Sequence, residues 1–404
     1  MVRRFSAALV VLLGLGCGES VRYDGVPGQP IAVTLIANTP AIPLRVNDVA
    51  EQLAVVDTGA PLTLLSRNAY PTLAAGRQVV TLGAFGLAFP EREVGVAALF
   101  SENGPCVDKP PAGLVGGDLL RFFRVGLDHR ARTMALFADE AELPAQEVDA
   151  KLVVPAEVVG GGQAVLPGGA LLEVPATRFL VTVETEGRSL PAMIDTGASM
   201  SVVSRGLLER LGEAGRPALC CESVSFVNGK TQAKVVRLKD LKVGGLKVTS
   251  LAALVIDDPA FFSALNQETR RSIDLLLGNN WLREAAVTFD YPAEQLELRT
   301  YRRPSVTSED YLLPGFSFCK AAQAEQGMVV LDVFKGSDAE RQGVRTGERL
   351  VAVDGQDLSR LSKSQALELF RRLGSGARPT LSFGAGGTPL KRAVAVEALL
   401  PDYH

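Results

Sequence analysis

Two aspartates in matching contexts are the residues of this 404-residue chain best suited to chemistry. Asp57 and Asp195 each begin an Asp-Thr-Gly-Ala turn, and each follows a short apolar run that predicts a buried strand. Aspartate is common in turns for local hydrogen-bonding reasons, so one copy alone would carry little weight. Two copies with the same flanks predict a paired site. Carboxyls held side by side retain one proton between them and can activate a water molecule.

The similarity between the two turns extends along the chain and indicates an internal duplication. Residues 113–128 resemble residues 274–290, and three aligned pairs share one separation of 162 residues. The aligned pairs are Gly116 and Gly278, Asp118 and Asn280, and Asp128 and Asp290. The two Asp-Thr-Gly turns are 138 residues apart, so the second copy holds 24 additional residues in its middle. We therefore expect two related halves, residues 29–138 and 171–302.

The first half, residues 29–138, reads as a succession of strands around the Asp57 turn. Residues 31–56 are strand-rich and carry a turn signal at Asn47 and Asp48. The glycine-punctuated segment 76–99 predicts a hairpin. By analogy with the second copy, residues 114–123 should form a strand that enters a short helix, followed by a second hairpin over 125–137.

The connection and the second half extend this plan. Residues 139–170 are acidic and then strand-like, which predicts added strands beneath both halves. Within residues 171–302, Asn228 and Gly229 predict a type I′ hairpin turn, and the tip of that hairpin is a candidate flap over the site. A helix over Asp258–Ser272 is expected to account for much of the additional length.

Composition and charge exclude several functions. The net charge is −3 and no long basic run occurs, so nucleic acid is not an expected partner. The only histidines are His129 and His404, which leaves little support for a Ser-His-Asp hydrolase. No Cys/His cluster has metal spacing, and we expect neither a metal nor a cofactor.

The N-terminus has the order of an export signal. Arg3 and Arg4 precede an apolar stretch that is too short to span a bilayer and ends at Cys17. The stretch resembles a bacterial lipoprotein signal, so residues 1–17 are predicted to be a signal peptide with Cys17 lipidated and residues 18–28 a linker. We expect the protein on the periplasmic face of a membrane, or soluble after export. Disulfides can persist there, but spacing does not determine how these cysteines pair: Cys106, Cys220, Cys221 and Cys319.

The duplicated motifs resemble those of the aspartic proteases. An Asp-Thr-Gly-Ala turn followed downstream by two apolar residues and a glycine is typical of that family, and the alanine is closer to retroviral-type enzymes than to pepsin. The resemblance covers residues 29–302. It implies a mostly β, bilobal, pseudo-two-fold fold built from two retropepsin-like barrel halves. Asp57 and Asp195 of one chain would then face each other as the catalytic pair.

The resemblance also implies roles for the residues beside the aspartates. Thr58 and Thr196 would lock the two loops together through hydroxyl-to-backbone bonds. Gly59 and Gly197 would allow the backbone its close approach. The loops would be braced from below by Leu114-Val115-Gly116 and Leu276-Leu277-Gly278.

Two features depart from pepsin. Ala60 and Ala198 stand where pepsin has hydroxyl residues, so we expect a less acidic pair and a mildly acid optimum. The first half shows no pepsin-like flap tyrosine, and Tyr70 is interpreted as a packing residue.

Residues 311–400 resemble a PDZ domain in their order of strands, short helix, glycine turns and amphipathic helix. Four residues match the carboxylate-binding loop of that family, with Ser317 in place of a glycine: Gly315, Phe316, Ser317 and Phe318. By resemblance, this loop would receive the C-terminus of a peptide that adds a strand to the domain. The helix over Lys363–Leu373 has no histidine, which favours apolar C-termini. An added β-sandwich that binds nothing is the alternative.

These features together predict an aspartic endopeptidase that cleaves between apolar residues of polypeptide substrates, with a PDZ domain that binds C-terminal peptides of substrates or partners. A non-catalytic peptide-binding envelope protein that keeps the fold is one alternative. A transport or assembly scaffold that works through its PDZ domain is another. The presence of both Asp57 and Asp195 favours the enzyme.

Overall fold

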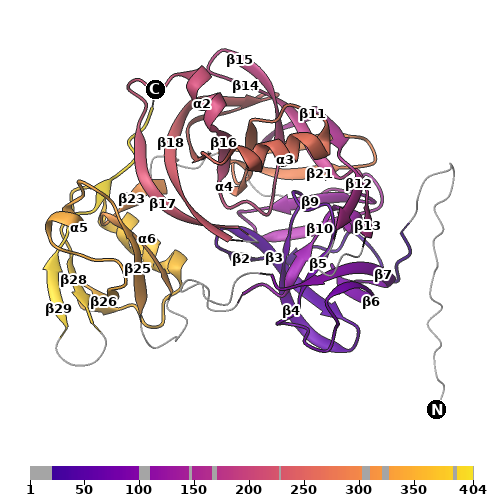
Figure 1. Ribbon diagram of the computed structural model, residues 1–404, viewed down its shortest axis with the longest axis horizontal. Helices are drawn as coiled ribbons and strands as arrows, with labels where there is room; N and C mark the ends of the chain where they lie inside the picture. The colour runs from indigo at the N-terminus through magenta and orange to yellow at the C-terminus, as the bar shows by residue number, and fades with distance from the viewer. Residues whose placement is uncertain are drawn as a thin grey trace.

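The computed structural model describes residues 21–99, 110–144, 148–165, 171–226, 229–302, 310–320, 327–384 and 389–403. Cys17, Cys106 and Asn228 therefore lie outside the described residues. The chain is mostly β, with the two halves side by side and residues 310–403 forming a separate C-terminal domain (Figure 1). No helix in the described ranges combines the length and the apolar character needed to cross a membrane.

The first half forms a seven-stranded sheet that curls into a barrel. Its order is β2-β3-β4-β8-β5-β7-β6, and an added pairing of β3 with β6 closes it. The strands are β2 (Thr34–Ile36), β3 (Thr39–Val46), β4 (Val49–Val56), β5 (Leu64–Ser66), β6 (Gly76–Ala84), β7 (Leu87–Ala97) and β8 (Gly113–Val115). The predicted turn at Asn47 and Asp48 and the hairpin over 76–99 are both confirmed.

The second half repeats this arrangement, and a pairing of β14 with β18 takes the place of the β3–β6 pairing. Its elements are β14 (Arg178–Thr185), β15 (Arg188–Ile194), β16 (Ser201–Ser204), α2 (Arg205–Leu211), β17 (Ala218–Phe226), β18 (Gly229–Val243), β19 (Leu246–Ile256), α3 (Pro259–Thr269), β20 (Leu275–Leu277) and α4 (Asn279–Leu282). In each half, the strand before the aspartate pairs in parallel with the strand before the aligned glycine, Gly116 or Gly278. These pairs are β4 with β8 and β15 with β20.

A shared sheet joins the two halves. Its strands run in the order β1-β10-β9-β21-β22-β11, and β9 pairs with β21 across the boundary. They are β1 (Ile31–Ala32), β9 (Arg124–Asp128), β10 (Thr133–Phe137), β11 (Val148–Val159), β21 (Ala285–Asp290) and β22 (Gln295–Tyr301), with α1 (Gly117–Leu120) before β9. The connecting segment thus adds β11 to this sheet, whereas β12 (Gly162–Val165) and β13 (Leu171–Val174) pair only with each other in the described chain.

The additional length of the second half lies mainly in α2, β17 and a longer β18. Ser66 pairs with Ala97 between two parallel strands, and Ser204 pairs with Ile256 in the equivalent place. The residue numbers of these pairs differ by 31 in the first half and by 52 in the second. Most of the insertion therefore precedes Ile256. The expectation that helix α3 accounts for much of it is wrong, although the helix itself is present.

The C-terminal domain has its own sheet and core. Its elements are β23 (Leu312–Leu313), β24 (Phe316–Lys320), β25 (Met328–Val333), α5 (Asp338–Arg341), β26 (Arg349–Val353), β27 (Gln356–Asp357), α6 (Lys363–Leu373), β28 (Thr380–Phe383), β29 (Leu390–Ala393) and β30 (Glu397–Ala398). Helix α6 has the predicted bounds because Ser362 and Gln365 form a capping box at its start. Phe316, Phe318 and Phe370 fill the core of this domain.

Candidate active site

The two aspartates lie at equivalent points of the two halves. Asp57 follows the buried end of β4, and its N–H donates to the carbonyl of Val115 at 3.0 Å. Asp195 follows β15 in the same way, and its N–H donates to the carbonyl of Leu277 at 2.9 Å. Both residues remain partly exposed. The fold therefore brings two carboxyls from distant parts of the chain to one place that solvent can reach.

Thr58 and Thr196 connect the two loops through four hydrogen bonds. Each backbone N–H donates to the hydroxyl of the other threonine at 3.0 Å. The Thr58 hydroxyl then donates to the carbonyl of Ile194 at 3.1 Å, and the Thr196 hydroxyl to that of Val56 at 2.6 Å. Both threonines have 0% exposure, so each bond forms away from competing water.

The two glycines allow the aspartates to meet. A Cβ atom on Gly59 would lie 2.4 Å from the carboxyl carbon of Asp195, and a Cβ atom on Gly197 would lie 2.3 Å from that of Asp57. Neither position has room for a side chain. The side chain of any larger residue at either position would overlap the opposite carboxyl, so glycine is required for the two aspartates to meet.

The electrostatics of the pair favour one shared proton. Burial, followed by the charge and hydrogen bond of Asp195, raises the pKa of Asp57 well above its usual range. Burial also raises the pKa of Asp195, but the N–H groups of Gly197 and Ala198 both donate to one of its oxygens and favour its charged form. Asp57 receives only the N–H of Ala60 among its described contacts. Asp195 thus receives more hydrogen bonds from backbone N–H groups than Asp57 does, and these favour its charged form.

Arg178 is a charged neighbour of the pair that the sequence motifs did not indicate. It begins β14, and because Phe179 pairs with Ile194, Arg178 lies beside the start of the Asp195 loop. Its guanidinium holds Glu268 of α3 through two hydrogen bonds of 3.0 Å. Its positive charge lowers the pKa of both aspartates. The pairing registers place Thr39 at the equivalent position of the first half, so the duplication itself gives no signal for this residue.

Tyr291 also lies close to the pair. It is buried, and burial together with the negative charges of Asp57 and Asp195 raises its hydroxyl pKa. Its ring packs edge to face against Phe179 at 5.2 Å. Within the described part of the chain its hydroxyl has no hydrogen-bond partner. The neutral phenol leaves the charge on the aspartate pair.

The segments that contain Gly116 and Gly278 brace the two aspartate loops as expected, but with different side chains in the two halves. The N–H of Gly117 donates to the Ala60 carbonyl at 2.8 Å, and the N–H of Asn279 donates to the Ala198 carbonyl at 2.9 Å. Asn279 adds side-chain bonds of 2.7 Å to the carbonyls of Thr196 and Ala198. The imidazole of His129 faces this amide, and burial lowers its pKa to about 4. The second loop thus has support that Gly117 cannot give to the first.

One hairpin of the second half packs beside the Asp195 loop. Residues 218–243, which we call the flap hairpin, include Leu219 and Val224 of β17, and these pack in one apolar cluster with Ala198 and Met200 of the Asp195 loop. Residues 227 and 228, at the predicted turn, lie outside the described residues. In the first half the hairpin turn at Phe85 is buried in the core, as is Tyr70, so neither covers the site.

The remaining predicted residues lie elsewhere. Gly315, Phe316, Ser317 and Phe318 belong to the C-terminal domain, where the hydroxyl of Ser317 donates to Asp332 at 3.0 Å. Cys220 and Cys221 form a disulfide with each other within β17, and Cys319 is buried. The described ranges contain no set of three or more His, Cys, Asp or Glu side chains arranged to hold a metal ion.

Comparison with known proteins places the second half in a family context. The chain matches no curated protein. It is similar to the solved structure of an aspartic proteinase from Irpex lacteus, with 13% identity and a TM-score of 0.42 over 69% of this chain and 99% of that chain. The family model described as aspartyl protease matches residues 181–281, a range that holds Asp195, the flap hairpin and the Leu276-Leu277-Gly278 brace.

Proposed function

We propose that this protein is an aspartic endopeptidase whose catalytic residues are Asp57 and Asp195. The observation that carries the proposal is the hydrogen-bonded pair of partly exposed carboxyls, held by reciprocal threonine bonds between the two halves. A structural role alone does not require two acids to meet where burial, followed by the charge of Asp195, raises the pKa of Asp57. The match of residues 181–281 to the aspartyl protease family supports the same assignment.

The proposed mechanism follows from the difference between the two carboxyls. Charged Asp195 takes a proton from a water molecule bound between the pair while protonated Asp57 donates its proton to the carbonyl oxygen of the substrate. The resulting tetrahedral diol collapses when a proton passes to the departing amine nitrogen and the C–N bond breaks. The threonine bonds keep the two acids at one separation during both steps.

The surroundings of the pair favour an extended peptide with apolar side chains. Ala60, Ala198 and Met200 follow the two aspartates and present no charge. The flap hairpin lies beside the Asp195 loop, and hairpin strands recognise extended backbone through main-chain hydrogen bonds. We therefore propose cleavage between apolar residues of unfolded or extended polypeptides.

The test is proteolysis of an unfolded protein by the purified full-length chain across a pH series. We expect pepstatin-sensitive cleavage in mild acid, reduced at least about a hundredfold by Asp57→Asn or Asp195→Asn. Asp258→Asn is the matched control, because Asp258 only caps helix α3 and asparagine caps equally well. Cleavage that survives both active-site substitutions would exclude this mechanism.

We further propose that residues 311–400 act as a PDZ-like peptide reader. Strand β24 lies at the edge of its described sheet, beside α6, as strand addition requires. Gly315 precedes β24 with a φ of 81°, and a Cβ atom there would lie 2.8 Å from the Cβ atom of Ser337, so the turn needs glycine. Peptides with an apolar C-terminus should bind in a fluorescence anisotropy assay. Amidation of that C-terminus should abolish binding, and equal binding of both forms would refute the proposal.

The proposed location is the periplasmic face of a bacterial membrane, with the chain anchored through lipidated Cys17. This rests on the order of residues 1–17 in the sequence. Mass spectrometry of the membrane fraction, with Cys17→Ser as the control, tests it. Recovery of unmodified chain from the soluble fraction alone would favour plain export.

A further inference from the structure

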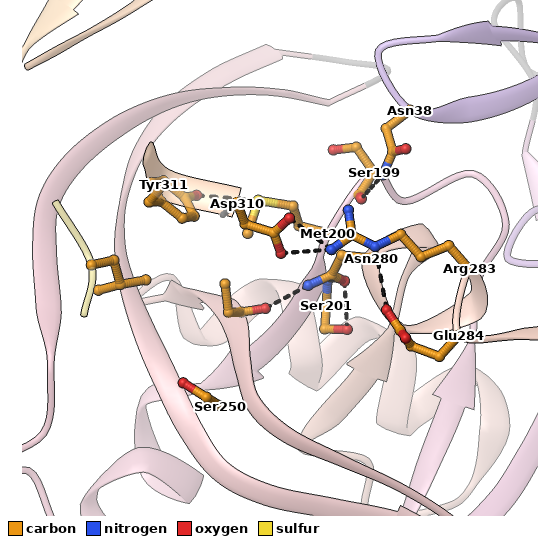
Figure 2. Close-up of polar contacts among 12 residues, drawn as sticks. Asn38, Ser199, Met200, Ser201, Ser250, Asn280, Arg283, Glu284, Asp310 and Tyr311 are labelled. Atoms are coloured by element: carbon orange, nitrogen blue, oxygen red, sulfur yellow. Dashed lines mark hydrogen bonds and ion pairs between the residues drawn. The ribbon is translucent and has the colours of Figure 1, made fainter. Parts of the chain in front are cut away.

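Tyr311, at the start of the C-terminal domain, contacts the second half beside the proposed peptidase site. Its hydroxyl lies 2.7 Å from a carboxylate oxygen of Glu222 in β17 and 3.3 Å from the sulfur of Met200 in the Asp195 loop. The side chain is 5% exposed and belongs to the apolar cluster that contains Leu219 and Met200. Figure 2 shows Tyr311 pointing toward Met200 from the turn directly before β23. One residue therefore contacts both the flap hairpin and a catalytic loop.

The preceding residue anchors Tyr311 in place. Asp310 accepts two hydrogen bonds, of 2.6 and 2.8 Å, from the guanidinium of Arg283 at the end of α4 (Figure 2). Helix α4 follows the glycine that braces the Asp195 loop. One guanidinium nitrogen donates to both carboxylate oxygens, and charge-assisted bonds of this kind hold the chain in position. The entry to the C-terminal domain is thus tied to the same loop assembly that Tyr311 contacts.

Strand β17 of the flap hairpin lies at the edge of its sheet, so contacts from the C-terminal domain help to hold it in place. In the described sheet β17 pairs only with β18, and the register shifts between Leu219 and Glu222, where the Cys220–Cys221 disulfide lies. The backbone ladder is interrupted directly before the residue that Tyr311 holds. A side-chain contact at Glu222 therefore restrains a segment that the sheet restrains weakly.

The other end of the C-terminal domain is attached to the same hairpin. Arg237 of β18 has 0% exposure and donates to the carbonyl of Leu400 at 3.0 and 3.3 Å. The N–H of Leu399 donates to the Tyr311 carbonyl at 3.0 Å, which ties the two ends of the domain together. Both ends of the C-terminal domain thus meet at the base of the flap hairpin.

We infer that Tyr311 is a positioning residue through which the C-terminal domain holds the flap hairpin against the Asp195 loop in the geometry that binds substrate. This inference rests on the proposed peptidase function. The threonine bonds fix the aspartates independently of Tyr311, so its loss should weaken substrate binding more than it slows the chemical step.

Steady-state kinetics on the full-length chain test this. Tyr311→Phe removes only the hydroxyl, and loss of one bond to a carboxylate should raise KM about tenfold with kcat within about twofold. Glu222→Gln should raise KM less, and the double variant should be no worse than Tyr311→Phe alone. Tyr301→Phe is the matched control, because it removes a buried tyrosine–carboxylate bond of 2.7 Å to Asp128 from β22, a strand that does not pair with the flap hairpin. Unchanged KM in Tyr311→Phe, or an equal change in Tyr301→Phe, would overturn the inference.

A second measurement does not need activity. Hydrogen–deuterium exchange of residues 218–226, made in an Asp195→Asn background, should be faster with Tyr311→Phe and unchanged with Tyr301→Phe. If wild type cleaves peptides and this exchange is unaltered, the inference fails and the peptidase proposal stands. If wild type cleaves nothing but exchange of β17 increases, the peptidase proposal fails and Tyr311 still holds the hairpin.

Discussion

Thr58 and Thr196 exchange backbone-to-hydroxyl bonds of the same length, 3.0 Å, although they lie 138 residues apart. The two bonds have equal length because two copies of the same turn face each other across a pseudo-two-fold axis. Each hydroxyl also donates to the strand end that precedes the opposite aspartate, at Ile194 and Val56. The separation of the two carboxyls is therefore set by the threonines and not by the acids, which repel each other when charged.

Thr58→Val should destabilise the protein and impair catalysis together. Valine has the same shape but leaves the Thr196 N–H without its partner in a buried place and removes the hydroxyl bond to the Ile194 carbonyl, which costs about 2–4 kcal/mol of unfolding free energy. Thr58→Ser keeps the hydroxyl and should lose less than about 1 kcal/mol. Urea unfolding curves measure both losses. Equal destabilisation by valine and serine would mean that the hydroxyl bonds contribute little.

Asp57→Asn should stabilise the protein increasingly as pH rises. Folding raises the pKa of Asp57, so its contribution to stability is full below the unfolded pKa and is lost as pH rises through the folded pKa. Asparagine does not ionise and avoids this loss. Thermal unfolding at a series of pH values should show the variant gaining on wild type from strongly acid to neutral pH. A gain that is largest in strong acid would contradict the raised pKa.

Much of the candidate site could be predicted from the sequence because the duplication is visible in short motifs. The turns at Asp57 and Asp195 and the helix over Lys363–Leu373 depend on local patterns, and the structure has these elements where the patterns put them. The flap hairpin was also visible as a strand pair. The source of the additional length was not, because a helical pattern at Pro259–Thr269 looks like an insertion until the parallel pairings reveal the equivalent residues.

The residues that sequence reasoning missed are those brought together by pairing between distant segments. Arg178 reaches the aspartates through the register of β14 with β15, and no motif surrounds it. Tyr311 lies 89 residues from Glu222, and their contact depends on how the C-terminal domain docks. A tyrosine before a strand gives no signal of its function. Residues of this kind can be identified only once the folded arrangement of the chain is known.

Arg178→Met should move the pH profile of cleavage upward. The positive charge of Arg178 lowers the pKa of both Asp57 and Asp195, and its removal also frees the negative charge of Glu268 nearby. Tyr291, a further titratable group beside the pair, has a raised pKa and stays neutral in this range. Both aspartates should therefore keep their protons to higher pH. The acidic and basic limbs of the kcat/KM profile should both move to higher pH. Arg271→Met, which breaks the exposed pair with Glu157, is the control and should leave the profile unchanged.

Asp118→Asn should stabilise the first half, because the second half already has an uncharged asparagine, Asn280, at the equivalent position. Asp118 is 8% exposed, and burial raises its pKa to about 6 although the Thr63 hydroxyl donates to it at 2.7 Å. Its equivalent is Asn280, which accepts from both the N–H and the hydroxyl of Ser201 without carrying charge. Ionisation of Asp118 between the unfolded pKa of 3.8 and the folded value of about 6 costs stability, at most about 3 kcal/mol above that range.

The Asp118→Asn variant should accordingly match wild type near pH 3 and exceed it by a margin that grows up to about pH 6 and is constant above. The reverse substitution, Asn280→Asp, is the matched control. It places an ionisable group in the equivalent buried position and should lose stability over the same pH interval. Unfolding free energies measured at several pH values distinguish this from a simple packing effect, since packing changes would shift stability equally at every pH. A pH-independent difference in both variants would show that the two positions do not carry the charge cost that their burial implies.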